Sequence, residues 1–151
     1  MVVFLGCGVP KPQPLYRANL SKLRPEQRIH DVYPVRIQRY ERELYQVQRE
    51  DGFYGTQADY KGQLRLEIYE LRKPEGIVEF WQKHLPGYFN EHVVYFQEAK
   101  NGHLHLEARG KRGEILLAFG QFPWVLVVEA TQEQLLDELV KNFPYLKKVS
   151  R

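Results

Sequence analysis

The chain has 151 residues, of which 43% are hydrophobic and 27% are charged, and its formal net charge is +3. This length is enough for one domain with its own core, and no apolar run approaches the 18 residues of a membrane-spanning helix. A single cysteine excludes an internal disulfide. With only two serines and two threonines, the chain offers few candidates for a hydroxyl nucleophile.

The cysteine lies near the start of the sequence, in Phe4-Leu5-Gly6-Cys7, after a short apolar run and before a proline-rich stretch. Leu5-Gly6-Cys7 resembles the lipobox of bacterial lipoproteins, in which a small residue precedes the cysteine that receives the lipid. The resemblance implies lipid attachment at Cys7 and a membrane-anchored, extracytoplasmic location. The alternative is that Met1 to Leu5 form a short edge strand and that Cys7 is a small buried hydrophobic residue.

Three prolines between positions 10 and 14 favour an extended segment. We therefore predict two parts, a leader remnant and proline-rich tether over residues 1–29 and a single folded domain over residues 30–151.

Positive charge is concentrated in residues 11–49, which hold nine basic and four acidic side chains. Beside an N-terminal anchor, this stretch would lie against anionic lipid headgroups. The same excess of charge is also suited to the phosphates of a nucleic acid, although a solvated helix surface would look no different in the sequence. The stretch is thus a candidate membrane contact, with nucleic acid as the less favoured partner.

The first predicted element is a helix over residues 35–49, because Ile37, Tyr40, Leu44 and Val47 recur at helical spacing. Two strands follow, over residues 53–60 and 63–71, joined by a turn at Lys61-Gly62. A second helix is predicted over residues 74–85 between two proline-containing turns.

The second half of the chain is predicted to be a meander of four strands and a final helix. Asn101-Gly102 is a strong hairpin signal, and Thr131-x-x-Gln134 matches a capping box at the start of the last helix. The expected core contact joins this helix to the preceding strand through Trp124, Leu126, Val128, Leu135 and Leu139.

The order helix, two strands, helix, four strands, helix predicts an α+β fold. We expect an antiparallel sheet of about five to six strands with helices packed mainly on one face. The other face would then be polar and exposed, because polar and apolar residues alternate along two of the strands. The side chains predicted on this possible binding face are Arg65, Glu67, Tyr69, His103, His105, Glu107 and Arg109.

Candidate chemistry is sparse. His103 and His105 share a strand face with Glu107, but a zinc site needs three or four ligands and no second cluster is near in the sequence, so we predict no metal. No histidine is placed to act as the base for a Cys7 nucleophile, and neither Glu41 and Glu43 nor Asp137 and Glu138 are placed in a pocket.

These observations predict no enzyme and no cofactor. The expected function is a non-catalytic, lipid-anchored extracytoplasmic domain of bacterial type that binds an unidentified protein or envelope ligand. The alternative is a soluble cytoplasmic domain that contacts nucleic acid through its arginine-rich first helix.

Overall fold

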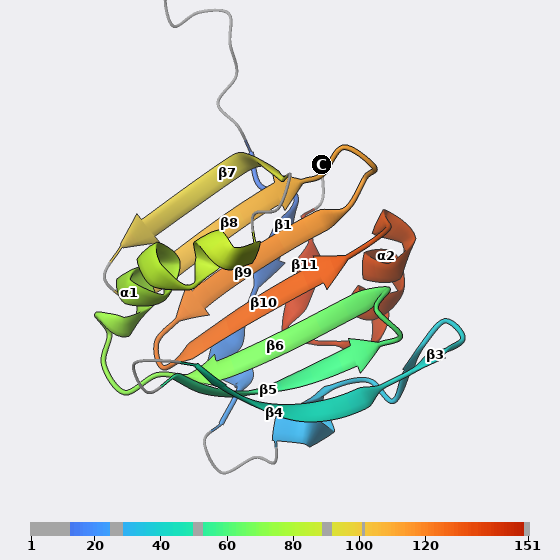
Figure 1. Ribbon diagram of the computed structural model, residues 1–151, viewed down its shortest axis with the longest axis horizontal. Helices are drawn as coiled ribbons and strands as arrows, with labels where there is room; N and C mark the ends of the chain where they lie inside the picture. The colour runs from blue at the N-terminus through green and yellow to red at the C-terminus, as the bar shows by residue number, and fades with distance from the viewer. Residues whose placement is uncertain (1–12, 25–28, 50–52, 89–91, 101, 150–151) are drawn as a thin grey trace, which may run out of the picture.

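The computed structural model describes residues 13–24, 29–49, 53–88, 92–100 and 102–149. Its centre is a seven-stranded antiparallel sheet in the order β4-β5-β6-β10-β9-β8-β7 (Figure 1). Two meanders, β4 to β6 and β7 to β10, meet where β6 pairs with β10. The fold is therefore α+β and mainly β, with a larger sheet than the sequence predicted. The strands are β4 Glu43–Arg49, β5 Phe53–Tyr60, β6 Leu64–Glu70, β7 Val93–Lys100, β8 His103–Arg109, β9 Ile115–Gln121 and β10 Trp124–Ala130.

Two helices and several short elements complete the described part of the fold. Strand β1 pairs with β11, and β2 pairs with β3 in a separate small hairpin. These elements are β1 Tyr16–Ala18, the 3₁₀ helices η1 Leu20–Lys22 and η2 Ile29–Val32, β2 Arg36–Ile37, β3 Tyr40–Glu41, α1 Gly76–Lys83, the 3₁₀ helix η4 Leu85–Tyr88, α2 Glu133–Asn142 and β11 Leu146–Lys148.

The helices cover opposite faces of the sheet, which corrects the prediction that they pack mainly on one face. In Figure 1, α1 lies in front of the sheet, and β1, β11 and α2 lie behind it. The α1 face has a core that includes Ile77 and Phe80, and the α2 face has a second core that includes Leu136 and Leu139. Both faces are thus buried over much of their area, so alternation along a strand does not identify a solvent face.

The predicted first helix over residues 35–49 is wrong, because this stretch forms β2, β3 and the edge strand β4. Gln38 has a φ of 53° in the turn of the small hairpin. Leu44 packs against the α2-face core and Val47 against the α1-face core, as expected for residues of opposite parity on a strand. Pairing of β4 with β5 along its whole length outweighs the helical spacing of the apolar residues.

Part of the predicted tether belongs to the folded domain. Residues 16–18 form β1, and Tyr16, Leu20 and Leu23 are buried in the α2-face core. The predicted boundary at residue 29 is therefore wrong for residues 13–24. Residues 13–24 have no periodic pattern in the sequence, and the segment is held by hydrogen bonds to a residue more than 90 positions away.

Several local predictions are confirmed. The turn between β5 and β6 has positive φ at Lys61 and Gly62, as a tight hairpin requires. The expected contact between β10 and the last helix is present, with Trp124, Leu126, Val128, Leu135 and Leu139 in one core. The capping box is not formed, because Gln132 precedes the helix and the Thr131 hydroxyl donates to Gln63.

Candidate functional site

The seven polar residues predicted on one exposed face lie on opposite faces of the sheet. Residues directly opposite one another on neighbouring strands share a face, and Leu66 is opposite Val128. Val128 is in turn opposite Leu117, which is opposite Glu107. Glu107 therefore shares a face with Leu66, and Glu67, the next residue along β6, is on the other face. The predicted single binding face is therefore wrong. Arg65, Glu67 and Tyr69 are on the α1 face, and His103, His105, Glu107 and Arg109 are on the α2 face.

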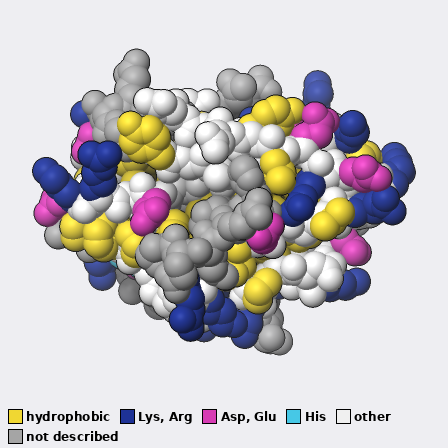
Figure 2. All heavy atoms as spheres, turned by 90° about the horizontal axis from the view of Figure 1, so that it is seen from below, with side chains coloured by type: hydrophobic (Ala, Val, Ile, Leu, Met, Phe, Trp, Pro, Cys, Tyr) yellow, Lys and Arg dark blue, Asp and Glu magenta, His cyan; other side chains and the backbone are white. Residues whose placement is uncertain are grey.

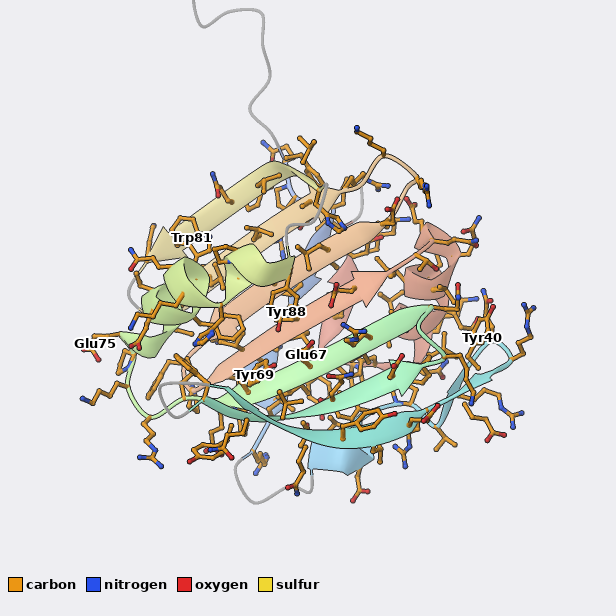
Figure 3. The ribbon with its side chains drawn as sticks, in the orientation of Figure 1. Tyr40, Glu67, Tyr69, Glu75, Trp81 and Tyr88 are labelled. Carbon is orange, nitrogen blue, oxygen red and sulfur yellow. The ribbon has the colours of Figure 1, made fainter. Side chains whose placement is uncertain are left out.

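Glu67 is buried on the α1 face, with 3% of its surface exposed. It accepts hydrogen bonds from the hydroxyls of Tyr69 and Tyr88, the latter at 2.7 Å (Figure 3). Burial and the Glu67 carboxylate raise the pKa of Tyr88, so its hydroxyl stays protonated and donates. The Tyr69 ring lies so close to Gly55 that any side chain there would meet it. This cluster joins η4 to the sheet.

Glu107 is completely buried on the α2 face and accepts four hydrogen bonds. Its Oε1 accepts from the Leu15 backbone N–H at 2.8 Å and from the Tyr95 hydroxyl at 2.5 Å. Its Oε2 accepts from the Tyr16 backbone N–H at 3.1 Å and pairs with His105 Nε2 at 2.6 Å. The carboxylate thus holds together β7, a histidine and residues 13–24, which we call the N-terminal segment.

The environment of Glu107 keeps it ionised. Burial by itself raises the pKa of its carboxyl, but the hydrogen bonds from His105, Tyr95 and the two backbone N–H groups outweigh burial and lower that pKa below its ordinary value. A carboxylate has about four lone-pair positions, and these donors occupy them. Glu107 is therefore a structural acceptor with no lone pair left for a substrate proton, and His105 Nε2 carries the hydrogen that it donates.

His105 lies between two phenylalanine rings, with centroids 4.7 Å from Phe96 and 4.8 Å from Phe119. The ring contacts and the bond to Glu107 fix the orientation of the imidazole. Beside it is a cavity of about 720 Å³, bounded by the N-terminal segment and by β7, β8 and β9. We call this cavity the His105 pocket. Its lining residues are Gln13, Pro14, Arg17, Ala18, Leu20, Phe96, Glu98, His103, Leu104, His105, Phe119, Gly120 and Gln121.

Three chargeable side chains other than His105 line the His105 pocket. Arg17 comes from β1, Glu98 from β7 and His103 from β8, and all three are exposed. Arg17 and Glu98 form no ion pair with any residue that the structure describes. The pocket therefore combines the rings of Phe96, His105 and Phe119 with an unpaired cation and an unpaired anion. A lining of aromatic rings with a few polar groups is typical of a small-molecule site.

The remaining predicted site residues have structural partners or lie outside the described residues. Arg65 forms an ion pair with Glu129 at 3.3 Å, and Arg109 forms one with Glu133 of α2 at 3.0 Å. Cys7 lies outside the described residues. Within the described ranges, no three metal-ligating side chains gather in one place, and no helix is both long and apolar enough to cross a bilayer.

The arginine-rich helix predicted over residues 35–49, the element expected to contact nucleic acid, is replaced by β2, β3 and β4. Arg36 pairs with Glu41 at 2.7 Å, and the Arg42 guanidinium donates to the Tyr33 carbonyl oxygen. Figure 2 shows basic side chains in separate groups on the face it displays, with acidic side chains among several of them. Among the described residues visible there, the basic side chains form no continuous stripe of the kind that tracks a phosphate backbone.

Sequence reasoning identified His103 and His105 but missed most of the pocket. Arg17 was recognised only as part of a basic stretch, and Phe96 and Glu98 only as strand residues. Phe96 and Glu98 do have the same parity on β7, which is the one local signal that they share a face. No local pattern indicates that β1 lies beside them.

No family model and no curated protein matches this chain. Its structure is similar to the crystal structure of a GTP binding regulator from Thermotoga maritima, with a TM-score of 0.50 and 13% sequence identity. The match covers 76% of this chain and 83% of that one. At this identity the likeness concerns the fold alone, and it assigns no role to any residue of the His105 pocket.

Proposed function

We propose that the chain is a non-catalytic binding domain that is attached to the outer side of a bacterial membrane through Cys7 and holds a small ligand in the His105 pocket. The observation that carries the binding role is the state of Glu107. This buried carboxylate has all its acceptor positions filled by the protein, so it positions His105 and the pocket wall and is not free to act as a general base.

The position of the N-terminal segment supports a link between the anchor and the pocket. Gln13 and Pro14 line the pocket, and Gln13 follows Cys7 by six residues. Six residues span at most about 20 Å, whatever their conformation. A lipid on Cys7 would therefore keep the pocket within about 20 Å of the membrane surface, where exposed Arg17 and Lys22 favour anionic headgroups.

The test expresses the gene with its natural upstream region and separates membranes from soluble protein. We expect the natural chain in the membrane fraction and Cys7→Ala in the soluble fraction. Ser21→Ala, a change of similar size in the same part of the chain, is the control and should stay with the membrane. Equal partitioning of the natural chain and Cys7→Ala would contradict the anchor.

The binding role is tested separately on the soluble Cys7→Ala chain. His105→Ala should lower the affinity of any bound small molecule, whereas His84→Ala on the α1 face should not. Retention of ligand affinity in His105→Ala would contradict the assignment of the pocket.

A further inference from the structure

The charged groups of the His105 pocket define the chemistry of its ligand. Glu98 and His105 are directly opposite each other on β7 and β8. Arg17 follows Tyr16, whose backbone N–H binds Glu107, the same carboxylate that pairs with His105. The cationic side chain of the pocket therefore comes from β1 and the anionic one from β7, and His105 and its two phenylalanine neighbours line the same pocket.

Resting on the binding role proposed above, we propose that the His105 pocket binds a zwitterionic small molecule that carries an ammonium group and a phosphate or carboxylate group. The acidic group binds Arg17, with His103 as a second donor, and the ammonium group binds Glu98. The methylene groups between them lie against Phe96 and Phe119.

Charge complementarity favours a zwitterion over a simple ion. A simple anion on Arg17 would share the pocket with the Glu98 carboxylate, and a simple cation on Glu98 would share it with Arg17. Like charges brought together at a binding site oppose binding. A ligand with both charges pairs with both side chains, and charged hydrogen bonds are among the stronger polar contacts.

The size and lining of the pocket agree with such a ligand. Its volume of about 720 Å³ lies within the usual range of small-molecule sites. The Gln121 side-chain oxygen accepts a hydrogen bond from the Leu20 backbone N–H at 3.3 Å, so the amide NH₂ of Gln121 remains as a further donor. Free amino-acid-like molecules and the headgroup of phosphatidylethanolamine share this chemistry.

The experiment uses the full Cys7→Ala chain and isothermal titration calorimetry with three matched probes. Phosphoethanolamine carries both groups, ethyl phosphate lacks the ammonium, and ethylamine lacks the phosphate. We expect phosphoethanolamine to bind at least about 10-fold more tightly than either of the others. Equal or tighter binding of ethyl phosphate would overturn the proposal in favour of a simple anion, and so would the absence of phosphoethanolamine binding.

Two charge-removing variants locate the site. Arg17→Gln and Glu98→Gln should each lower the affinity for phosphoethanolamine about 10-fold or more, and Glu98→Gln should bind ethyl phosphate more tightly. Lys22→Gln, on the same N-terminal segment, and Glu75→Gln, at the start of α1 (Figure 3), are matched controls that should change neither affinity. Because all four side chains are exposed, the melting temperatures should agree.

Vesicles then distinguish the two sources of the ligand. Binding to phosphatidylethanolamine vesicles that phosphoethanolamine displaces identifies the lipid headgroup, and binding of the free molecule alone identifies a soluble zwitterion. Both results support the proposal. Failure of all three soluble probes would overturn the ligand class without touching the anchor, which is tested by membrane fractionation of the natural chain.

Discussion

The two faces of the seven-stranded sheet are closed in different ways. The α1 face is covered by α1 and η4, which come from the single connection between β6 and β7. The α2 face is covered by α2, β11 and the N-terminal segment, which come from both ends of the described chain. A local connection therefore closes one face, and distant segments close the other.

Among the residues that the structure describes, each face contains one buried glutamate, and the donors to the two carboxylates reflect this difference. Glu67 binds tyrosine hydroxyls from its own strand and from η4. Glu107 binds backbone N–H groups that are 91 and 92 residues away, as well as Tyr95 and His105. A buried carboxylate costs little only while its hydrogen-bond donors stay in place. Glu107 therefore makes the His105 pocket depend on the docking of the N-terminal segment.

The largest expected effect separates the two glutamates. Glu107→Gln keeps one acceptor oxygen where the native carboxylate uses two, so it leaves buried donors facing an NH₂ group. We expect it to lower the free energy of unfolding by about 3–5 kcal/mol. Glu67→Gln should cost less, about 1 kcal/mol, because an amide oxygen placed at the position of Oε1 can still accept from both Tyr69 and Tyr88. Urea denaturation measures both, and equal losses would remove the distinction between the faces.

A second pair of variants tests the hydrophobic part of each closure. Leu139 on α2 and Ile77 on α1 are both fully buried. Leu139→Ala and Ile77→Ala should each cost about 2–5 kcal/mol, as large-to-small changes in a core do. A loss below about 0.5 kcal/mol for either would show that its helix is not needed to close that face.

A smaller effect is expected at the close contact on the α1 face. A Cβ at Gly55 would lie 2.5 Å from the Ile68 carbonyl oxygen and 2.5 Å from the Tyr69 ring. Gly55→Ala should therefore cost about 1–3 kcal/mol through displacement of Tyr69. Gly87→Ala is the control, because a Cβ there meets nothing within 4 Å, and it should be neutral. A neutral Gly55→Ala would mean that Tyr69 can move away from Glu67 without loss.

The most gradual effect is the pH dependence contributed by Glu107. The pKa of its carboxyl is lower in the folded chain than the ordinary value of 4.5. Its contribution to stability is therefore complete above about pH 4.5 and is lost as the pH falls toward the lower folded value. The difference in unfolding free energy between the natural chain and Glu107→Gln should shrink below pH 4.5. A difference that is constant from pH 6 to pH 3 would contradict the lowered pKa.

The sequence by itself determined most of the elements that follow residue 53. Alternation within β8, the hairpin turn at Lys61-Gly62 and the apolar runs of β9 and β10 are local signals, and each corresponds to an observed element. The amphipathic pattern of α2 also identified Leu135 and Leu139 as core residues. These features follow from interactions between residues close together in the sequence, so a local pattern is sufficient to predict them.

Only the tertiary structure decided which side of the sheet each residue occupies and what closes it. The α1 face and the α2 face are both covered, so polar positions such as Glu67 and Glu107 are buried where alternation indicates exposure. Residues 43–49 become an edge strand because they pair with β5, although their apolar spacing fits a helix. The His105 pocket depends on Arg17 of β1, and hydrogen bonds across more than 90 residues leave no periodic trace in the sequence.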